Sequence, residues 1–290
     1  MESAPNARTP DTTTVERQIT HRTRGRIKGH VIRLMSPPDL GQVLKPFVFL
    51  DLFDVDVSSG GFPPHPHSGI GTVTVLTEGD LRFDDPGSGK GILSYGGVEW
   101  MRAAGGVWHG KELAAGTSAR VRGLQLWIAL PPELENGPVE SQFFEASTIP
   151  QIGPARLILG SYDSVHSPVR SPTGMNYLLV TLKAGERWRY TPPAGQEIAW
   201  LCVSKGALLA SQRVEFGELA LFENGTDPID LQAGTEGEAT FVIASAVPHA
   251  HDLVLGYYSV HTNRAALQRA EANIVEIGAR LQLKAPHIAS

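Results

Sequence analysis

The chain has few cysteines, few charged side chains and no long apolar run. A single cysteine in 290 residues, Cys202, excludes an internal disulfide and a cysteine-rich zinc site, and its apolar neighbours predict a buried position. With 19% charged and 41% hydrophobic residues, the chain is neither disordered overall nor a charge-rich coiled coil. No apolar run approaches the roughly 18 residues of a membrane span, and the polar first residues predict no secretory leader. We therefore expect a soluble, cytoplasmic protein without a membrane partner.

Positive charge is also in short supply. The 25 basic and 30 acidic residues give a net charge of −5, so no global basic field exists and direct nucleic-acid binding is not expected. Basic side chains stand at every second position from Arg22 to Lys28, which predicts the solvated face of a strand. The segment 87–91, Gly-Ser-Gly-Lys-Gly, lacks the Ser or Thr of a phosphate-binding loop and predicts a hairpin turn.

Turn-forming residues, in contrast, are abundant, with 31 glycines and 21 prolines. Short apolar runs separated by such residues are typical of all-β sandwiches and barrels. We expect strands at residues 47–50, 72–76, 91–93, 123–130, 177–182, 199–203 and 241–244. One helix is expected at about residues 263–282, capped by Thr262 or Asn263, because apolar residues recur there at helical spacing, at Leu267, Ala270, Ile274, Ile277 and Leu281.

The two halves of the chain share a weak internal pattern. An apolar strand that closes on Gly79 matches one that closes on Gly206, and segment 97–105 matches segment 217–225. We expect a disordered tail at residues 1–15, a first barrel at residues 16–150 and a second barrel at residues 151–290, with the boundary in a turn-rich segment.

The placement of the histidines is the feature that points to chemistry. His65 and His67 lie two residues apart, so in an extended segment both imidazoles face the same side, and the intervening Pro66 stiffens that shape. His109 follows a predicted strand and is the third candidate. Three imidazoles in a barrel mouth would leave open metal positions for water, O₂ or a substrate. The alternative is a proline-rich turn with incidental surface histidines.

The stretch from Pro46 to Glu112 resembles the N-terminal half of the pirin family, through GFPPHPHSGIGTVTVLTEG and GGVEWMRAAGGVWHGKE. The resemblance continues in GLQLWIALP, which begins at Gly123, and in YSVHT, which begins at Tyr258. Pirins are bicupins, so it implies an all-β fold of two tandem cupin (double-stranded β-helix, jelly-roll) barrels with a C-terminal helix.

By the same resemblance, His65, His67 and His109 match three metal ligands, usually of Fe²⁺, although Mn, Ni, Zn or Cu would also suit such a site. Some pirins are reported to open flavonols such as quercetin with O₂, and others act as transcriptional coregulators. The resemblance thus implies either a dioxygenase acting on a small aromatic hydroxy-carbonyl substrate or a metal-dependent regulatory module that binds a protein partner. A third alternative is a cupin that has lost its metal. No catalytic side chain is assigned, because the metal would organise the chemistry.

Two positions depart from the family pattern. The family usually has a fourth ligand, a glutamate, two residues after the third histidine, whereas Glu112 follows His109 by three. The side-chain period of two predicts that Glu112 points out of the barrel unless the chain bulges at Gly110. We therefore expect three histidines plus water at the metal. The acid that usually follows the HPH segment is replaced by Gly71, which also makes the site less anionic.

The second half of the chain is expected to bind no metal. Counting from the matched glycines places Pro192, Ala194 and Ile229 at the positions of the three histidines, and none of these can ligate. A second His-x-His pair, His249 and His251, has no third partner at matching distance and is expected to lie in a loop.

Overall fold

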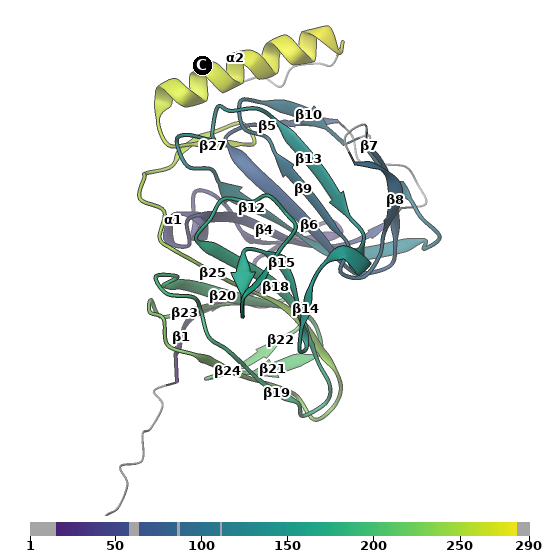
Figure 1. Cartoon of the computed structure of the whole chain (residues 1–290), viewed down its shortest axis with the longest axis vertical. Helices are drawn as coiled ribbons and strands as arrows, with labels where there is room; N and C mark the ends of the chain where they lie inside the picture. Colours follow the sequence, from purple (N-terminus) through teal and green to yellow (C-terminus); the bar gives the residue numbers. More distant parts are fainter. Residues whose placement is uncertain (1–15, 58–63, 86–87, 111, 283–290) are drawn as a thin grey trace, which may run out of the picture.

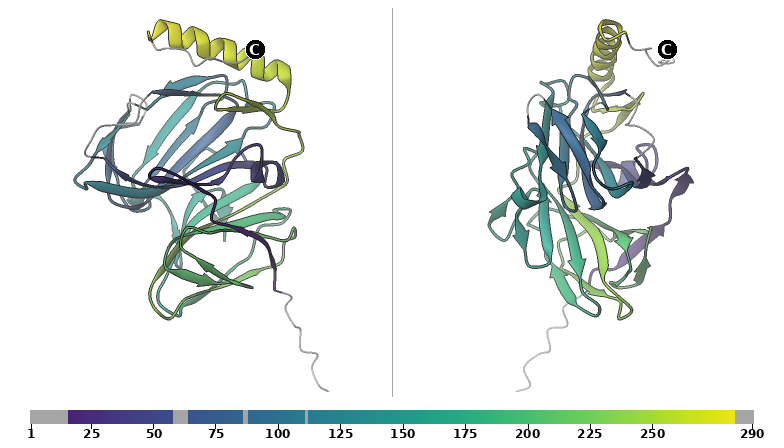
Figure 2. Two further views of the ribbon diagram at one scale, coloured as in Figure 1. Left: turned by 180° about the vertical axis from the view of Figure 1, so that it is seen from behind. Right: turned by 90° about the vertical axis from the view of Figure 1, so that its right-hand side faces the viewer.

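The computed structural model describes residues 16–57, 64–85, 88–110 and 112–282, so the predicted disordered tail at residues 1–15 lies outside the described residues. Two large antiparallel sheets form the body of the molecule, stacked along its long axis (Figures 1 and 2). The predicted all-β class, with two barrels and a C-terminal helix, is confirmed. All seven apolar runs that predicted strands fall on strands, residue 130 excepted.

The N-terminal half builds one sheet of seven strands and two smaller sheets that close the barrel. The large sheet runs in the order β13 (Glu140–Phe144), β9 (Val98–Arg102), β6 (Ile70–Glu78), β12 (Arg120–Ala129), β4 (Phe47–Asp56), β3 (Val31–Met35), β2 (Arg26–Lys28). The smaller sheets pair β10 (Val107–His109) with β5 (His65–His67), and β11 (Leu113–Ala115) with β7 (Leu81–Asp85) and β8 (Gly89–Leu93). The short helix α1 (Leu40–Val43) precedes β4.

The C-terminal half repeats this plan. Its seven-stranded sheet runs in the order β1 (Ile19–Thr23), β23 (Leu219–Phe222), β20 (Ile198–Lys205), β25 (Ala239–Ala246), β18 (Met175–Leu182), β15 (Ala155–Leu159), β14 (Gln151–Ile152). The smaller elements are β19 (Arg187–Tyr190), β24 (Ile229–Ala233), β21 (Ala207–Leu209), β22 (Arg213–Glu215), the hairpin of β16 (Ser161–Tyr162) and β17 (Val165–His166), and the 3₁₀ turn η1 (Ala146–Thr148).

The internal repeat seen in the sequence corresponds to equivalent places in the two sheets. β6 ends just before Gly79 and takes the third place of its sheet, and β20 ends just before Gly206 and takes the third place of the other. β9 and β23, which carry the second pair of matching segments, take the second place in each sheet.

The two ends of the chain cross between the halves. β1 pairs with β23, with Thr23 opposite Leu219, so this N-terminal strand completes the C-terminal sheet. In return, the hairpin of β26 (Val254–Gly256) and β27 (Ser259–His261) and the helix α2 (Arg264–Arg280) pack on the N-terminal barrel, as Figure 1 shows. The predicted domain limits of 16–150 and 151–290 remain a prediction, to which the structure adds this exchange of ends.

The predicted terminal helix is present and begins as expected. The Asn263 side chain caps α2 by accepting a hydrogen bond from the Ala266 amide at 2.9 Å. The buried side of the helix includes Leu267 and Ile274, and the Trp108 indole donates to the Ile274 carbonyl oxygen at 3.0 Å. The helix thus covers the strand that carries His109.

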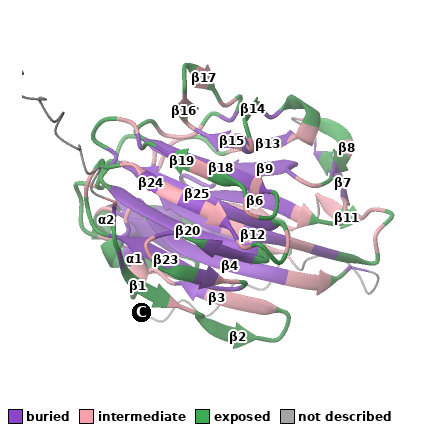
Figure 3. Cartoon of the chain, turned by 90° about the horizontal axis from the view of Figure 1, so that it is seen from below, coloured by how far each residue is buried: buried purple, intermediate pink, exposed green. Residues whose placement is uncertain are grey.

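The largest apolar cluster lies between the two large sheets, and Figure 3 shows buried residues concentrated in their central strands. Phe47 of the N-terminal sheet and Trp200 of the C-terminal sheet pack in a T-shaped arrangement, with ring centroids 5.5 Å apart. Cys202 is fully buried in the same cluster, as its neighbours predicted. The two barrels therefore share one core and form a continuous hydrophobic unit.

We expect Gly69→Ala to destabilise the protein more than Gly29→Ala. Both glycines have a positive φ, +70° and +61°. A Cβ at Gly69 would lie 2.0 Å from the Val260 carbonyl oxygen and 2.7 Å from the His261 ring, whereas nothing lies within 4 Å of a Cβ at Gly29. Both variants strain the backbone, but only Gly69→Ala collides with the C-terminal hairpin, at a further cost of about 1–3 kcal/mol. Urea denaturation measures the difference, and equal losses would contradict the close approach.

Candidate metal centre

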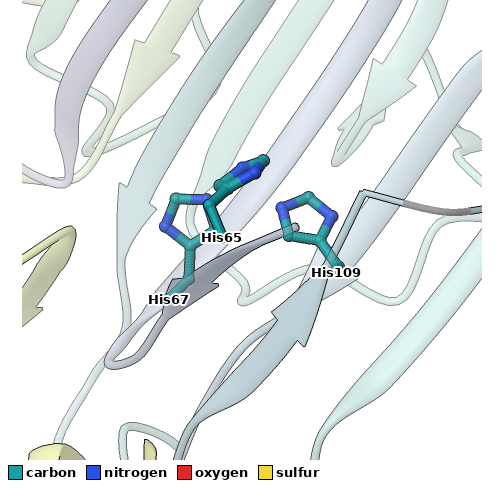
Figure 4. A group of neighbouring side chains, drawn as sticks. All are labelled: His65, His67 and His109. Carbon is teal, nitrogen blue, oxygen red and sulfur yellow. The ribbon is translucent and has the colours of Figure 1, made fainter. Parts of the chain in front are cut away.

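The structure brings together the three histidines that the sequence singles out. His65 and His67 lie on β5, and His109 lies opposite His65 on the paired strand β10. Figure 4 shows the three rings on the same side of this strand pair, with His109 facing the other two. One candidate ligand nitrogen from each ring lies within 4.8 Å of the others. Their role as metal ligands remains a prediction.

The protonation of His67 is fixed by its backbone partner. The side chain is buried, and its Nδ1 lies 3.1 Å from the Tyr258 carbonyl oxygen. Because a carbonyl only accepts hydrogen bonds, Nδ1 carries the proton and Nε2 keeps its lone pair. The Nε2 atoms of His67 and His109 are both buried and have no hydrogen-bond partner among the described residues. The unpaired lone pair of His67 fits a cation, and three imidazoles with a nitrogen of each within 4.8 Å of the others are the arrangement that a divalent metal requires.

Both rings are held in the neutral form. Burial lowers the pKa of His67 well below its usual range, and the neighbouring His109 and His65 act in the same direction. Burial also lowers the pKa of His109 to about 3, again assisted by His65. A metal would therefore not have to displace protons from these two imidazoles at neutral pH.

His65 and His109 open on a cavity of about 160 Å³ inside the N-terminal barrel. Four polar side chains follow one another across its strands in register. Gln125 of β12 lies opposite Asp51 of β4 and Thr74 of β6, and Thr74 in turn lies opposite Glu99 of β9. All four line the cavity, as do His65 and His109.

Glu99 is a candidate functional residue that no sequence motif indicates. It is 6% exposed, and its Oε1 lies 4.0 Å from the His109 Nδ1, the ring nitrogen on the side away from the unpaired Nε2. Burial raises the pKa of Glu99 to about 7, and a hydrogen bond from Thr74 opposes the shift while the charge of Glu112 adds to it. The sequence feature that could have identified Glu99 is its position as an acidic residue within the otherwise apolar segment Val98–Met101.

Glu112 does not lie where the strand period predicted. An outward position is wrong, because the chain departs from a regular strand at Gly110, whose φ is +124°. The Glu112 carboxylate accepts a hydrogen bond from the Gly110 amide at 2.8 Å and lines the cavity beside His109. It is not part of the group of ligand atoms within 4.8 Å, so a site of three histidines plus water remains our prediction.

A buried polar network fixes the chain next to His67. The Ser68 hydroxyl donates to the Ser259 hydroxyl at 2.8 Å and lies 3.0 Å from the His261 Nε2. The other ring nitrogen of His261 lies 3.3 Å from a Glu135 carboxylate oxygen. Serine, histidine and acid occur here in the order of a nucleophile triad, but Ser68 is fully buried, so a substrate cannot reach it. The network instead ties the C-terminal hairpin to the strand that holds His67.

The other patterns named in the sequence lead to no second site. His249 and His251 lie in a loop, as predicted, and belong to no three-ligand group in the described part of the chain. Exposure of the four basic residues is as predicted, but a single strand face is wrong, because β1 ends at Thr23 and β2 begins at Arg26 in the other large sheet. Arg22 pairs with Glu218 at 3.1 Å. Strands β7 and β8 form the predicted hairpin, although residues 86–87 of its turn lie outside the described residues.

The second barrel has a different interior. Its position Ile229 is buried in an apolar cluster with Tyr190, whose hydroxyl hydrogen-bonds to Ser245 at 2.6 Å. A metal-free second barrel remains a prediction. Neither helix within the described ranges combines the length and the apolar character that crossing a membrane requires.

The sequence matches known families and proteins over much of its length. The pirin family model matches residues 28–128. The chain is 41% identical over 121 residues to a pirin-like protein of Caulobacter vibrioides, which covers 41% of this chain and 43% of that protein. It is 31% identical over 205 residues to a pirin-like protein of Solanum lycopersicum, which covers 68% of each. The chain thus spans less than half of the first relative and about two thirds of the second.

Solved structures show the same fold. A quercetin 2,3-dioxygenase from Acinetobacter baumannii superposes with a TM-score of 0.79 at 25% identity, over 91% of this chain and 98% of that one. A bacterial pirin from Escherichia coli, solved in complex with nickel(II), gives a TM-score of 0.59 at 18% identity, over 80% and 98% of the two chains. At that identity the second likeness shows the fold alone.

Replacing His67 with Ala is expected to abolish stoichiometric metal binding, since it removes a buried Nε2 whose orientation is fixed by the Tyr258 carbonyl. Metal content is measured by elemental analysis of protein purified without oxygen. His249→Ala is the matched control, because it removes an imidazole from a His-x-His pair outside the cluster. Unchanged metal content in His67→Ala would refute the ligand assignment.

Glu112→Gln is expected to change metal affinity by less than about tenfold, which is the smallest effect usual for residues that support metal ligands without coordinating. His109→Ala, in contrast, removes a predicted ligand and is expected to lose the ion. Competition with a chromophoric chelator measures both affinities. Comparable losses in the two variants would show that Glu112 coordinates and that the site has four protein ligands.

Proposed function

The chain belongs to the pirin family, and from this premise we propose that it is a metal-dependent dioxygenase with Fe²⁺ held by His65, His67 and His109. The proposed substrates are small aromatic hydroxy-carbonyl compounds of the flavonol type, the class named in the quercetin dioxygenase that shares the fold. The observation that carries the proposal is the convergence of the three imidazoles, two with buried and unpaired Nε2 atoms, at a cavity inside the barrel. A cytoplasmic location is part of the same proposal.

When bound, the ion would offer open positions at which a chelating substrate and O₂ react. The protein's own groups orient the ligands and shape the space. The Tyr258 carbonyl fixes the tautomer of His67, and the Glu99 carboxylate lies on the Nδ1 side of His109. The barrel wall gives the cavity an apolar side, lined by Phe53 and Leu81 among others, where electrostatic contacts are stronger than in open water.

The choice of Fe²⁺ rests on the ligand chemistry and on the family. Imidazole nitrogens suit iron, zinc, copper and nickel, and three of them leave the open positions that oxygen chemistry needs. Manganese, nickel, zinc and copper are the competing ions. Neutral histidines alone select weakly among these metals, so metal analysis of the purified protein decides between them.

A regulatory module that binds a protein partner is the second candidate, and one observation favours it. Tyr257 and Tyr258, at the tip of the β26–β27 hairpin, are 42% and 43% exposed. The Tyr258 ring lies 5.9 Å from the His67 ring between centroids, and the backbone of the same residue holds His67. An ion at the histidines could therefore set the position of an exposed aromatic surface, which is the kind of surface that protein partners use.

Iron-loaded protein is expected to consume O₂ when quercetin is added, measured with an oxygen electrode after anaerobic purification. His109→Ala should lose both iron and O₂ uptake, because it removes a ligand atom, while His249→Ala should retain both. Bound iron without O₂ uptake would reject the dioxygenase and favour the regulatory module. Protein that binds no metal at any stage would reject both.

A further inference from the structure

We infer that the cavity beneath the histidines takes a single uncharged ring that carries hydroxyl groups, so a substrate enters it with one end. The inference rests on the proposed function for the presence of the ion. It adds the chemical class of the group that the cavity recognises, which three features of the cavity determine: its volume, a row of polar side chains and its charge.

The volume of the cavity suits one ring. The cavity measures about 160 Å³. An engineered cavity of about 150 Å³ in another protein binds benzene, whereas pockets that enclose a whole drug-sized ligand measure roughly 300–1,000 Å³. One ring of a flavonol fits the space, but three do not. The rest of such a molecule would stay at the mouth, where His65 and His109 lie.

One side of the cavity recognises hydroxyl groups. Asp51, Gln125, Thr74 and Glu99 form a row across four neighbouring strands and all line the space. A carboxylate accepts a hydrogen bond from a hydroxyl, and the Gln and Thr side chains can both donate and accept. The remaining wall is apolar and contacts the ring faces, with Val31, Phe53, Val55, Leu81 and Leu113.

The charge of the cavity selects against acids. Glu99 and Glu112 line it, and none of the described lining residues is Lys or Arg; the third lining acid, Asp51, is neutralised by Arg33. The nearby Arg33 guanidinium is bound by both oxygens of Asp51 and lies over the Phe49 ring, 4.0 Å from its centroid. A carboxylate on the side of the ring away from the ion would be desolvated next to Glu99 and Glu112, with no Lys or Arg among the described lining residues to offset their charge, which is unfavourable.

A matched pair of probes tests this inference. Kojic acid and comenic acid are single-ring hydroxypyranones with the same chelating hydroxy-ketone, and they differ in a hydroxymethyl group on the first and a carboxylate on the second. We expect iron-loaded wild-type protein to bind kojic acid at least about tenfold more tightly than comenic acid. Anaerobic calorimetry measures both affinities, and elemental analysis afterwards verifies that the iron has stayed on the protein.

Variants locate the discrimination in the cavity. Glu99→Gln keeps the size of the side chain and removes its charge, so it should reduce the kojic-to-comenic ratio severalfold. Thr74→Val should weaken kojic acid, and Val55→Phe, which fills part of the space, should weaken both probes. Glu133→Gln makes the same charge change on an exposed residue and should leave the ratio as it is in wild type.

The outcomes separate this inference from the proposed function. Equal affinities for the two probes, no binding of either, or the same ratio in Glu99→Gln and Glu133→Gln would overturn the inference. A ratio as expected without quercetin-dependent O₂ uptake would leave the inference standing and reject the dioxygenase. Oxygen uptake without discrimination between the probes would support the dioxygenase and overturn the inference about the cavity.

Discussion

Burial of the imidazoles in the mouth of the N-terminal barrel is the constraint on which the candidate site depends. Removal from water keeps His67 and His109 neutral, and their Nε2 atoms have no hydrogen-bond partner in the part of the chain that the structure describes. A buried polar atom left unpaired costs roughly 1–3 kcal/mol, so the fold holds two such costs close together. A cation bound between the rings would satisfy both atoms at once. His67 and His109 would therefore need to lose no proton to accept an ion.

The exchange of chain ends explains how distant segments support this site. The strand that carries His65 and His67 is only three residues long, too short to fix its own position. The C-terminal hairpin supplies the missing restraint, through the Tyr258 carbonyl and the buried contacts of His261. α2 covers the partner strand through the bond from Trp108. The geometry of the candidate ligands therefore depends on residues roughly 190 positions away in the chain.

The sequence carries the fold more fully than it carries the site. Apolar runs between turn residues predict the strands, helical spacing with Asn263 predicts α2, and the His-x-His segment with its family resemblance leads to all three histidines. The prediction that Glu112 points out of the barrel was wrong, because it assumed that side chains alternate along a regular strand and the backbone at Gly110 is not regular. The approach of Glu99 to His109 is set by the pairing of β9 with β6 and by barrel closure, which no local pattern encodes.

The placement of the two glutamates changes the electrostatics inferred from the sequence. The altered spacing after His109 and the glycine at position 71 both indicated a less anionic site. Yet Glu112 still reaches the cavity, and Glu99 adds a second carboxylate beside the ring of His109. In the proposed site, neutral histidines would hold the ion while the acidic groups around it would supply the opposing charge, so affinity and selectivity would arise from different residues. The pair of Asp51 with Arg33 leaves this balance unaltered, since it is neutral as a whole. The same acids that favour a divalent ion then disfavour an anionic ring, which links metal binding and substrate choice in one small cavity.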